Sequence, residues 1–275
     1  MNSIKDTVQL NNGVEMPLLG LGVFLSKEGS EVINAVKWAL EAGYRHIDTA
    51  AIYQNEEGVG QAIRESEINR EDVFVVSKLW NSDQGFDSGL RAFDESLKKL
   101  KMDYLDLYLI HWPVADKYKD SWKALEKLYR DGRVKSIGVS NFMQHHLEDL
   151  LGSVEIMPMV NQMEFHPYLM QDDLREFCKQ KEIQYESWSP LMQGKIFEIE
   201  LLNDLAGKYN KSIAQLVIRW NIQKKVVCIP KSSKKERIIQ NANIYDFNIS
   251  EEDMLLIDSL DTGTRVGPDP DNFDF

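Results

Sequence analysis

The sequence is poor in cysteine, in long apolar runs and in positive charge, and each shortage excludes a class of protein. It has two cysteines, Cys178 and Cys228, outside any C-x-x-C pair, which predicts buried reduced thiols rather than a disulfide framework. No apolar run approaches the ~18 residues of a membrane span. Acidic residues outnumber basic ones by 44 to 32, and this balance lacks the basic footprint of nucleic-acid-binding proteins.

Further shortages narrow the class. The first ten residues carry no basic-then-apolar signal region, so we expect a soluble, cytoplasmic protein with no membrane or nucleic-acid partner. No unaccounted large apolar face calls for a partner, which favours a monomer. With 43% apolar residues in 275, the chain can bury a sizeable core. Because no Pro/Gly/Ser-rich linker interrupts it, we predict one domain, residues 1–275.

Short β-like runs alternate with amphipathic helical patterns. Asn12-Gly13 within Val8–Met16 predicts a tight N-terminal hairpin, and the apolar stripe from Phe86 to Leu100 has helical spacing. Eight further strands are predicted, at Leu18–Leu21, Tyr44–Asp48, Val73–Lys78, Leu105–Ile110, Ser136–Ser140, Met159–Met163, Gln184–Trp188 and Val226–Ile229. Eight β–α alternations predict an α/β protein of the (β/α)8 TIM-barrel type. The tail Asp261–Phe275 is predicted to be a loop over the active-site end.

An open doubly wound sheet is the alternative fold. It usually carries a Gly-rich nucleotide loop after its first strand. Here Gly20-Leu21-Gly22 is followed by Leu25 where the third glycine should stand, which favours the barrel.

Polar side chains follow the predicted strands at the point where each strand ends. Asp48, Lys78 and His111 end or follow the second, third and fourth strands, and Tyr53 lies five residues past Asp48. Taken singly, each has an ordinary structural explanation, such as a helix cap, a solvated lysine or a hydrogen-bonded core histidine. Barrel active sites gather at the carboxyl ends of the strands, so the convergence of four titratable groups there favours a catalytic site.

Proton donation to a carbonyl is the chemistry that needs this set. A tyrosine phenol has a pKa near ~10 and is a poor acid unless its anion is stabilised. Lys78 could supply that stabilisation, and Asp48 would keep the ammonium charged and oriented. A neutral His111 could hydrogen-bond the substrate oxygen.

These residues lie in long motifs, and with them the sequence resembles the aldo-keto reductase superfamily from end to end. Within it, the pattern is most similar to bacterial glyoxal, methylglyoxal and diketogluconate reductases and to protozoan prostaglandin F synthases. The resemblance implies a catalytic tetrad of Asp48, Tyr53, Lys78 and His111. The matching stretches are Gly43–Ala50 with Tyr53, Ser77–Trp80, Asp106–Pro113, Ile137–Phe142 and Ile229–Ser232.

The resemblance also implies NADPH, bound without a Gly-rich loop. Ser140, Asn141 and Gln162 offer groups that could fix the nicotinamide carboxamide, and Trp188 offers a stacking surface, although core packing is its ordinary alternative. Further cofactor contacts are predicted at Gly22, Val23, Asp48, Ser189, Leu191, Gln240 and Asn241.

The run from Ile229 to Arg237 is the one concentrated basic patch. A solvated helix start is its ordinary interpretation, but barrels of this kind bind phosphate after the eighth strand. Lys231, Ser232 and Arg237 suit the 2′-phosphate of NADP, which favours NADPH over NADH. Past Leu191 the chain has Gln193-Gly194-Lys195 where many relatives have a small polar residue, so closure over the pyrophosphate stays open.

The predicted activity is reduction of aldehydes and reactive ketones, such as α-dicarbonyls or diketo sugar acids, with Tyr53 as proton donor. Aromatic walls suit a small-molecule carbonyl substrate, and no metal is expected. The substrate-binding set is Phe24, Ile52, Trp80, His111 and Trp112, with Phe273 and Phe275 of the tail as closing groups.

Two other functions compete. A Schiff-base lyase would use Lys78 as nucleophile, but it needs a lysine of lowered pKa, and Asp48 would raise that pKa. A nucleotide-sensing regulatory module would bind NADPH with little turnover, and the intact tetrad argues against it. Asp106 has no role that the sequence assigns.

Overall fold

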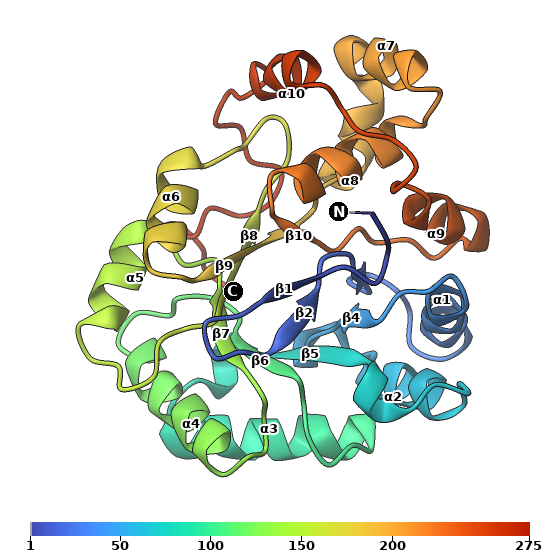
Figure 1. Ribbon diagram of the computed structural model, residues 1–275. Coiled ribbons are helices and arrows are strands. Elements are labelled where there is room, and N and C mark those ends of the chain that lie inside the picture. The colour runs from blue at the N-terminus through green and yellow to red at the C-terminus, as the bar shows by residue number, and fades with distance from the viewer. Residues whose placement is uncertain (1) are drawn as a thin grey trace.

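Eight parallel strands form the centre of the protein, which is described by a computed structural model over residues 2–275. Neighbours in sequence are neighbours in space, in the order β3 to β10, and Figure 1 shows them enclosed by helices. The strands are β3 (Leu21–Gly22), β4 (His46–Asp48), β5 (Phe74–Leu79), β6 (Leu107–Ile110), β7 (Ile137–Ser140), β8 (Val160–Glu164), β9 (Gln184–Trp188) and β10 (Val227–Cys228).

The first and last strands meet and close the sheet into a barrel. Isolated parallel bridges join Leu19 to Cys228 and Gly22 to Lys231. The amide of Gly20 donates to the carbonyl of Cys228, and the amide of Cys228 donates to that of Leu18, each at 2.9 Å. The predicted (β/α)8 class is confirmed.

The helices follow from the apolar stripes. The stripe of Phe86–Leu100 forms α3 over those same residues. The first helix is followed by Gly43 with φ 98°, where the amide of Tyr44 donates back to Ala39 at 3.0 Å. The helices are α1 (Ser30–Glu41), α2 (Glu56–Arg64), α3, α4 (Tyr118–Arg130), α5 (Gln144–Leu151), α6 (Asp172–Gln180), α7 (Glu200–Lys208), α8 (Ile213–Gln223), α9 (Lys235–Ala242) and α10 (Glu251–Asp258).

The N-terminal hairpin is present, as predicted, with Asn12-Gly13 in its turn. Strands β1 (Thr7–Gln9) and β2 (Glu15–Pro17) pair antiparallel. The amide of Leu10 donates to the carbonyl of Val14 at 2.9 Å, and the amide of Gly13 donates to the carbonyl of Leu10 at 2.8 Å, so the turn is tight. Asn12 also donates to the carbonyl of Lys135 at 2.9 Å, just before β7, which places the hairpin across the N-terminal end of the barrel.

Strand bounds also shift slightly. The first predicted strand, Leu18–Leu21, is observed at Leu21–Gly22, because residues before it reach the sheet only through the single bridge of Leu19. β9 has the predicted bounds, and the other barrel strands begin or end within two residues of them.

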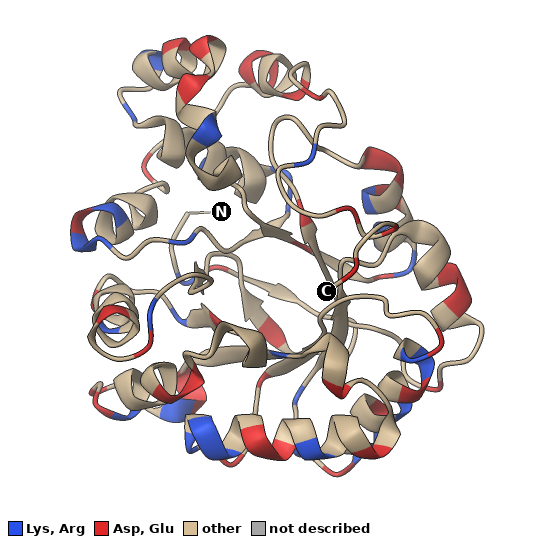
Figure 2. Ribbon diagram, turned by 180° about the vertical axis from the view of Figure 1, so that it is seen from behind, with Lys and Arg blue, Asp and Glu red and all other residues tan. Residues whose placement is uncertain are grey.

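The C-terminal tail crosses the opposite end of the barrel, as predicted. At the end of β8 the carboxylate of Glu164 accepts hydrogen bonds from the amides of Val266 (2.6 Å) and Gly267 (3.1 Å). In Figure 2, which is seen from behind, the chain's last residue lies near the middle of this end. The tail therefore covers the carboxyl ends of the strands.

Other residues singled out by the sequence have structural roles. Cys178 and Cys228 are buried free thiols, and burial raises the pKa of Cys178 to about 12. Asp106 accepts from the amide of Val75 at 3.0 Å and pairs with Arg70 (2.8 Å) and Lys135 (3.0 Å), so it ties strands together away from the site. Within residues 2–275, no helix is both long and apolar enough to span a membrane.

Candidate active site

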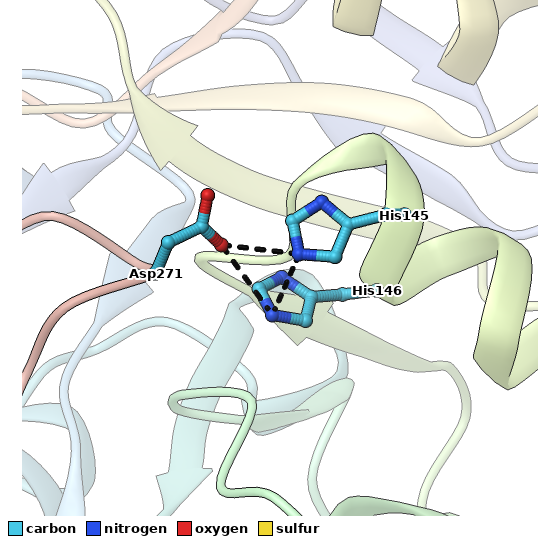
Figure 3. Close-up of side chains that lie close together, drawn as sticks. All are labelled: His145, His146 and Asp271. Carbon is cyan, nitrogen blue, oxygen red and sulfur yellow. Dashed lines mark hydrogen bonds and ion pairs between the residues drawn. The ribbon is translucent and has the colours of Figure 1, made fainter.

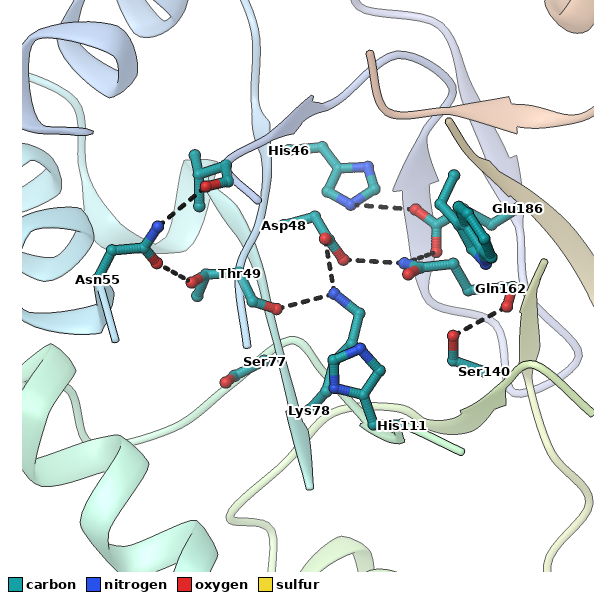
Figure 4. Close-up of polar contacts among 12 residues, drawn as sticks. His46, Asp48, Thr49, Asn55, Ser77, Lys78, His111, Ser140, Gln162 and Glu186 are labelled. Carbon is teal, nitrogen blue, oxygen red and sulfur yellow. Dashed lines mark hydrogen bonds and ion pairs between the residues drawn. The ribbon is translucent and has the colours of Figure 1, made fainter. Parts of the chain in front are cut away.

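Asp48, Lys78, Tyr53 and His111 come together at the carboxyl end of the barrel. Asp48 ends β4, Lys78 lies on β5 and His111 follows β6. The Lys78 ammonium donates to Asp48 Oδ1 at 2.6 Å and to the carbonyl of Thr49 at 2.9 Å, as Figure 4 shows. Lys78 is fully buried and Asp48 is 2% exposed, so solvent screens this ion pair little.

Tyr53 ends a short 3-10 helix (Ala51–Tyr53) beside this pair. Lys78 Nζ lies 5.1 Å from the centre of the Tyr53 ring, and the His111 ring centre lies 5.8 Å from it. Fully buried Asn55, which the sequence analysis missed, braces the loop before Tyr53. Its amide donates to the carbonyls of Val23 (2.9 Å) and Ser26 (3.0 Å) and accepts from Thr49 Oγ1 (2.7 Å).

The protonation states suit a proton donor, with one correction to the expectation. Burial raises the pKa of Tyr53 and the charge of Lys78 lowers it, and burial prevails. The free protein therefore has a neutral phenol rather than an acidified one, because desolvation outweighs the neighbouring ammonium. Burial, and then Lys78, hold the pKa of His111 well below its usual range, so this imidazole is neutral as expected.

Lys78 is held as an ammonium. Burial alone would lower its pKa, but Asp48 and Tyr53 and the short hydrogen bond to Asp48 raise it above the usual value. A Schiff-base nucleophile needs a neutral amine, so this environment opposes the lyase alternative.

The residues expected at the nicotinamide lie side by side on the next strands. Ser140 on β7 pairs in register with Gln162 on β8. The Asn141 amide donates to the carbonyl of His111 at 2.9 Å, and its Oδ1 accepts from the indole N–H of Trp188 at 2.9 Å. The residues predicted to hold the nicotinamide are thus hydrogen-bonded to the backbone of His111.

The side-chain carbonyl oxygen of Gln162 is free to accept a hydrogen bond from a carboxamide. Its amide nitrogen donates to Asp48 Oδ2 and to Glu186 Oε2, both at 2.9 Å. Its carbonyl oxygen accepts no hydrogen bond from residues 2–275 and is left for a donor such as a carboxamide NH₂. The donor set therefore fits a nicotinamide.

Glu186 and its neighbour His46 were missed by the sequence analysis, although a signal existed. His46 stands two residues before Asp48 and Glu186 two before Trp188. Residues two apart in a strand face the same side, so both point into the barrel, where neither is exposed.

The basic patch lies after β10 and enters α9. Lys231 and Arg237 are exposed and make no ion pair with the described residues, whereas Lys235 lies 3.5 Å from Glu41. Ser232 is buried, and its Oγ accepts from the amide of Lys234 at 3.2 Å. Unpaired cations before and within the first turn of a helix fit a phosphate. On the same helix, Gln240 is exposed and Asn241 is buried.

The loop after β9 has an irregular backbone. Ser189 (φ 50°), Gln193 (φ 53°) and Gly194 (φ 99°) have left-handed conformations, and the amide of Gly194 donates to the carbonyl of Leu191 at 2.8 Å. Gln193, Gly194 and Lys195 are exposed.

Aromatic rings surround the tetrad. Phe24 lies 5.0 Å from Tyr53, and Trp80 lies 5.1 Å from His111. The tail completes the wall, because Phe273 packs on Trp112 at 5.1 Å between ring centres and Phe275 stacks on Trp80 at 5.8 Å. The Asn81 amide also donates to the carbonyl of Phe275 at 2.9 Å. Ile52, the neighbour of Tyr53, is 38% exposed.

A cluster of His145, His146 and Asp271 has the composition of a metal site (Figure 3). Asp271 Oδ1 lies 3.1 Å from His145 Nε2 and 3.6 Å from His146 Nε2. However, His146 Nδ1 accepts from the amide of Met143 at 3.2 Å, so in the neutral ring Nε2 carries the hydrogen and has no lone pair for a metal. The cluster instead joins the tail to α5.

Known proteins share this architecture. Residues 19–262 match the sequence model of the aldo/keto reductase family. The chain is 59% identical to a glyoxal reductase of Bacillus subtilis, covering 99% of both chains. It is 55% identical to a 9,11-endoperoxide prostaglandin H2 reductase of Trypanosoma cruzi, covering 99% of this chain and 98% of that one.

A solved structure, an aspartate-to-alanine mutant of Gox0644 in complex with NADPH, is 41% identical, with a TM-score of 0.94 over 98% of this chain and 99% of that one. The sequence match, these relatives and the barrel fold all indicate the same family. The chain belongs to the aldo/keto reductase family.

Proposed function

We propose that this protein uses NADPH to reduce aldehydes and reactive ketones, above all small α-dicarbonyls such as glyoxal and methylglyoxal. The observation that carries the proposal is the buried Asp48–Lys78 pair, 2.6 Å apart, beside Tyr53 and a neutral His111. Its similarity to a glyoxal reductase supports the substrate class, and the surrounding aromatic rings fit a small carbonyl compound.

The reaction divides between cofactor and protein. NADPH, when bound, supplies the hydride that the carbonyl carbon accepts. Tyr53 gives its phenolic proton to the carbonyl oxygen, and Lys78 stabilises the phenolate that this leaves. Asp48 keeps Lys78 charged and directed. The neutral His111 holds the carbonyl oxygen by a hydrogen bond.

The proposed cofactor residues follow the groups that the structure leaves available. Ser140, Asn141 and Gln162 would hold the carboxamide, and Trp188 would cover a face of the nicotinamide. Lys231, Ser232 and Arg237 would bind the 2′-phosphate. The remaining proposed contacts are Gly22, Val23, Asp48, Ser189, Leu191, Gln240 and Asn241.

Replacing the two exposed cations tests the phosphate assignment. For Lys231→Ala and Arg237→Ala we expect roughly tenfold weaker NADPH binding each, since each removes a charge-assisted phosphate contact. NADH affinity should stay unchanged. Tryptophan-fluorescence titration with both nucleotides measures this, and Lys181→Ala, at an exposed lysine near Asn12 at the other end of the barrel, is the matched control. An unchanged NADPH/NADH ratio would contradict the assignment.

Removing the tail's aromatic rings tests the pocket. In a Phe273→Ala/Phe275→Ala variant we expect the KM for methylglyoxal to rise several-fold, because Trp80 and Trp112 lose the rings that pack on them. Steady-state kinetics on small and bulky aldehydes measures this. If all substrates keep their KM, the tail is not part of the pocket.

A carbonyl panel tests the function itself. Loss of NADPH absorbance with glyoxal and methylglyoxal is expected. Tight NADPH binding without turnover would instead support the regulatory module, and borohydride trapping of substrate on Lys78 would support the lyase. We also propose a monomeric, cytoplasmic enzyme in which residues 1–275 act as one domain.

A further inference from the structure

A chain of buried polar groups lies behind Asp48, inside the barrel. His46 Nε2 is 3.5 Å from Glu186 Oε1, and Glu186 Oε2 accepts from Gln162 Nε2 at 2.9 Å. The same Gln162 nitrogen donates to Asp48 Oδ2 at 2.9 Å. None of the four residues exceeds 2% exposure. Figure 4 shows the connection from His46 through to Lys78.

The contact between His46 and Glu186 needs a proton. His46 Nδ1 faces the carbonyl of Pro17 at 3.4 Å, and a carbonyl only accepts, so Nδ1 carries the ring hydrogen. Burial lowers the pKa of His46 to about 4, so Nε2 keeps a lone pair. Nε2 and Glu186 Oε1 otherwise have no hydrogen-bond partner. One proton on Glu186 Oε1 satisfies both atoms at once.

The surroundings of Glu186 favour its protonated form. Burial, and then the negative charge of Asp48, raise the pKa of Glu186 to about 8, against lowering by Gln162 and Lys78. A neutral Glu186 leaves Asp48 as the single carboxylate charge beside Lys78, so the buried pair stays balanced.

Asp48 and Glu186 together determine how Gln162 is presented. Its two N–H groups are both taken, by Asp48 and by Glu186. A flipped amide would place its oxygen against the Asp48 carboxylate, where two acceptors repel. The carbonyl oxygen of Gln162 is therefore the group that stays available to a ligand.

We propose that Glu186, with His46 behind it, is a positioning residue that fixes the Gln162 amide so that its oxygen accepts from the carboxamide of NADPH. This inference rests on the proposed function, because it takes Gln162 as a ligand of the nicotinamide. Glu186 acts through Gln162 and touches neither substrate nor cofactor.

Two substitutions at Glu186 separate this role from others. In Glu186→Gln the new amide can accept from Gln162 and donate to His46 Nε2, as the neutral acid does, so we expect NADPH affinity within twofold of the wild type. In Glu186→Leu the acceptor is lost, and we expect roughly tenfold weaker NADPH binding. Fluorescence titration of the protein with NADPH measures both.

A cofactor analogue shows whether the effect passes through the carboxamide. The 3-acetylpyridine analogue of NADPH has a methyl group in place of the carboxamide NH₂, so Gln162 has nothing to accept from. We expect Glu186→Leu to leave the affinity for this analogue nearly unchanged. Equal weakening of both nucleotides, or equal loss in Glu186→Gln and Glu186→Leu, would overturn the proposal.

A control variant at another buried carboxylate and an infrared measurement complete the test. Glu126 is a buried carboxylate that accepts from the amides of Glu155 and Ile156, and Glu126→Leu should lower stability without changing discrimination between the two nucleotides. The infrared C=O band of a protonated acid should be present in the cofactor-free wild type and absent in Glu186→Gln, and its absence from the wild type would overturn the proton assignment.

The same measurements distinguish failure of this inference from failure of the proposed function. A wild type that neither binds NADPH nor reduces dicarbonyls removes the proposed function. A wild type that does both, with Glu186→Leu indistinguishable from it, removes the role of Glu186 alone.

Discussion

Tyr53→Phe should lower the rate of carbonyl reduction by about 10²–10⁴-fold, the usual contribution of a positioned general acid. The substitution removes the phenolic hydroxyl of Tyr53 and keeps its ring against Phe24 and His111. Affinity for NADPH should hardly change, because the phenol acts on the substrate. NADPH oxidation at saturating methylglyoxal measures the rate, and fluorescence titration measures the affinity.

Tyr129→Phe is the matched control for this variant. Tyr129 lies on α4, and its hydroxyl reaches Asn12 of the N-terminal hairpin at 3.5 Å, at the other end of the barrel. It should keep full activity. Turnover by Tyr53→Phe close to that of the control would remove Tyr53 from the role of proton donor.

Lys78→Met should have the second large effect, on activity and stability together. The substitution leaves the Asp48 carboxylate buried without its ammonium, and breaking such a pair typically costs about 3–5 kcal/mol. Reduction should fall as far as in Tyr53→Phe, since the phenolate loses its stabilising charge. Urea denaturation and NADPH oxidation measure the two effects.

A double substitution separates the effect on activity from the effect on stability. In Asp48→Asn/Lys78→Met no charge is stranded, so most of the lost stability should return while the activity does not. Recovery of activity with stability would show that Lys78 serves the fold and has no part in proton transfer.

Much of the fold was predictable because its signals are local. The helical stripe of Phe86–Leu100 and the strand Gln184–Trp188 appear in the structure with unchanged bounds. A barrel also brings every strand end to one rim, so Asp48, Lys78 and His111 could be placed together without coordinates. The hairpin turn at Asn12-Gly13 was predictable for the same reason, because a dipeptide preference is local.

The rest depends on contacts between distant segments. Glu186 and His46 are 140 positions apart, and neither lies at the carboxyl end of its strand. Asn55 reads as an ordinary helix start until the carbonyls of Val23 and Ser26 are beside it. The pKa of Tyr53 is the balance of burial against one ammonium, and its sign cannot be inferred from neighbours in the sequence.

The seam of the barrel has a consequence for ligand binding. Its first and last strands are two residues long and meet through a few bridges, among them Gly22 with Lys231. Residues proposed to contact NADPH lie on both sides of this junction. A bound dinucleotide would therefore contact both strands of this weakly paired junction and stabilise the closed barrel. Without the dinucleotide, these two strands would separate more readily.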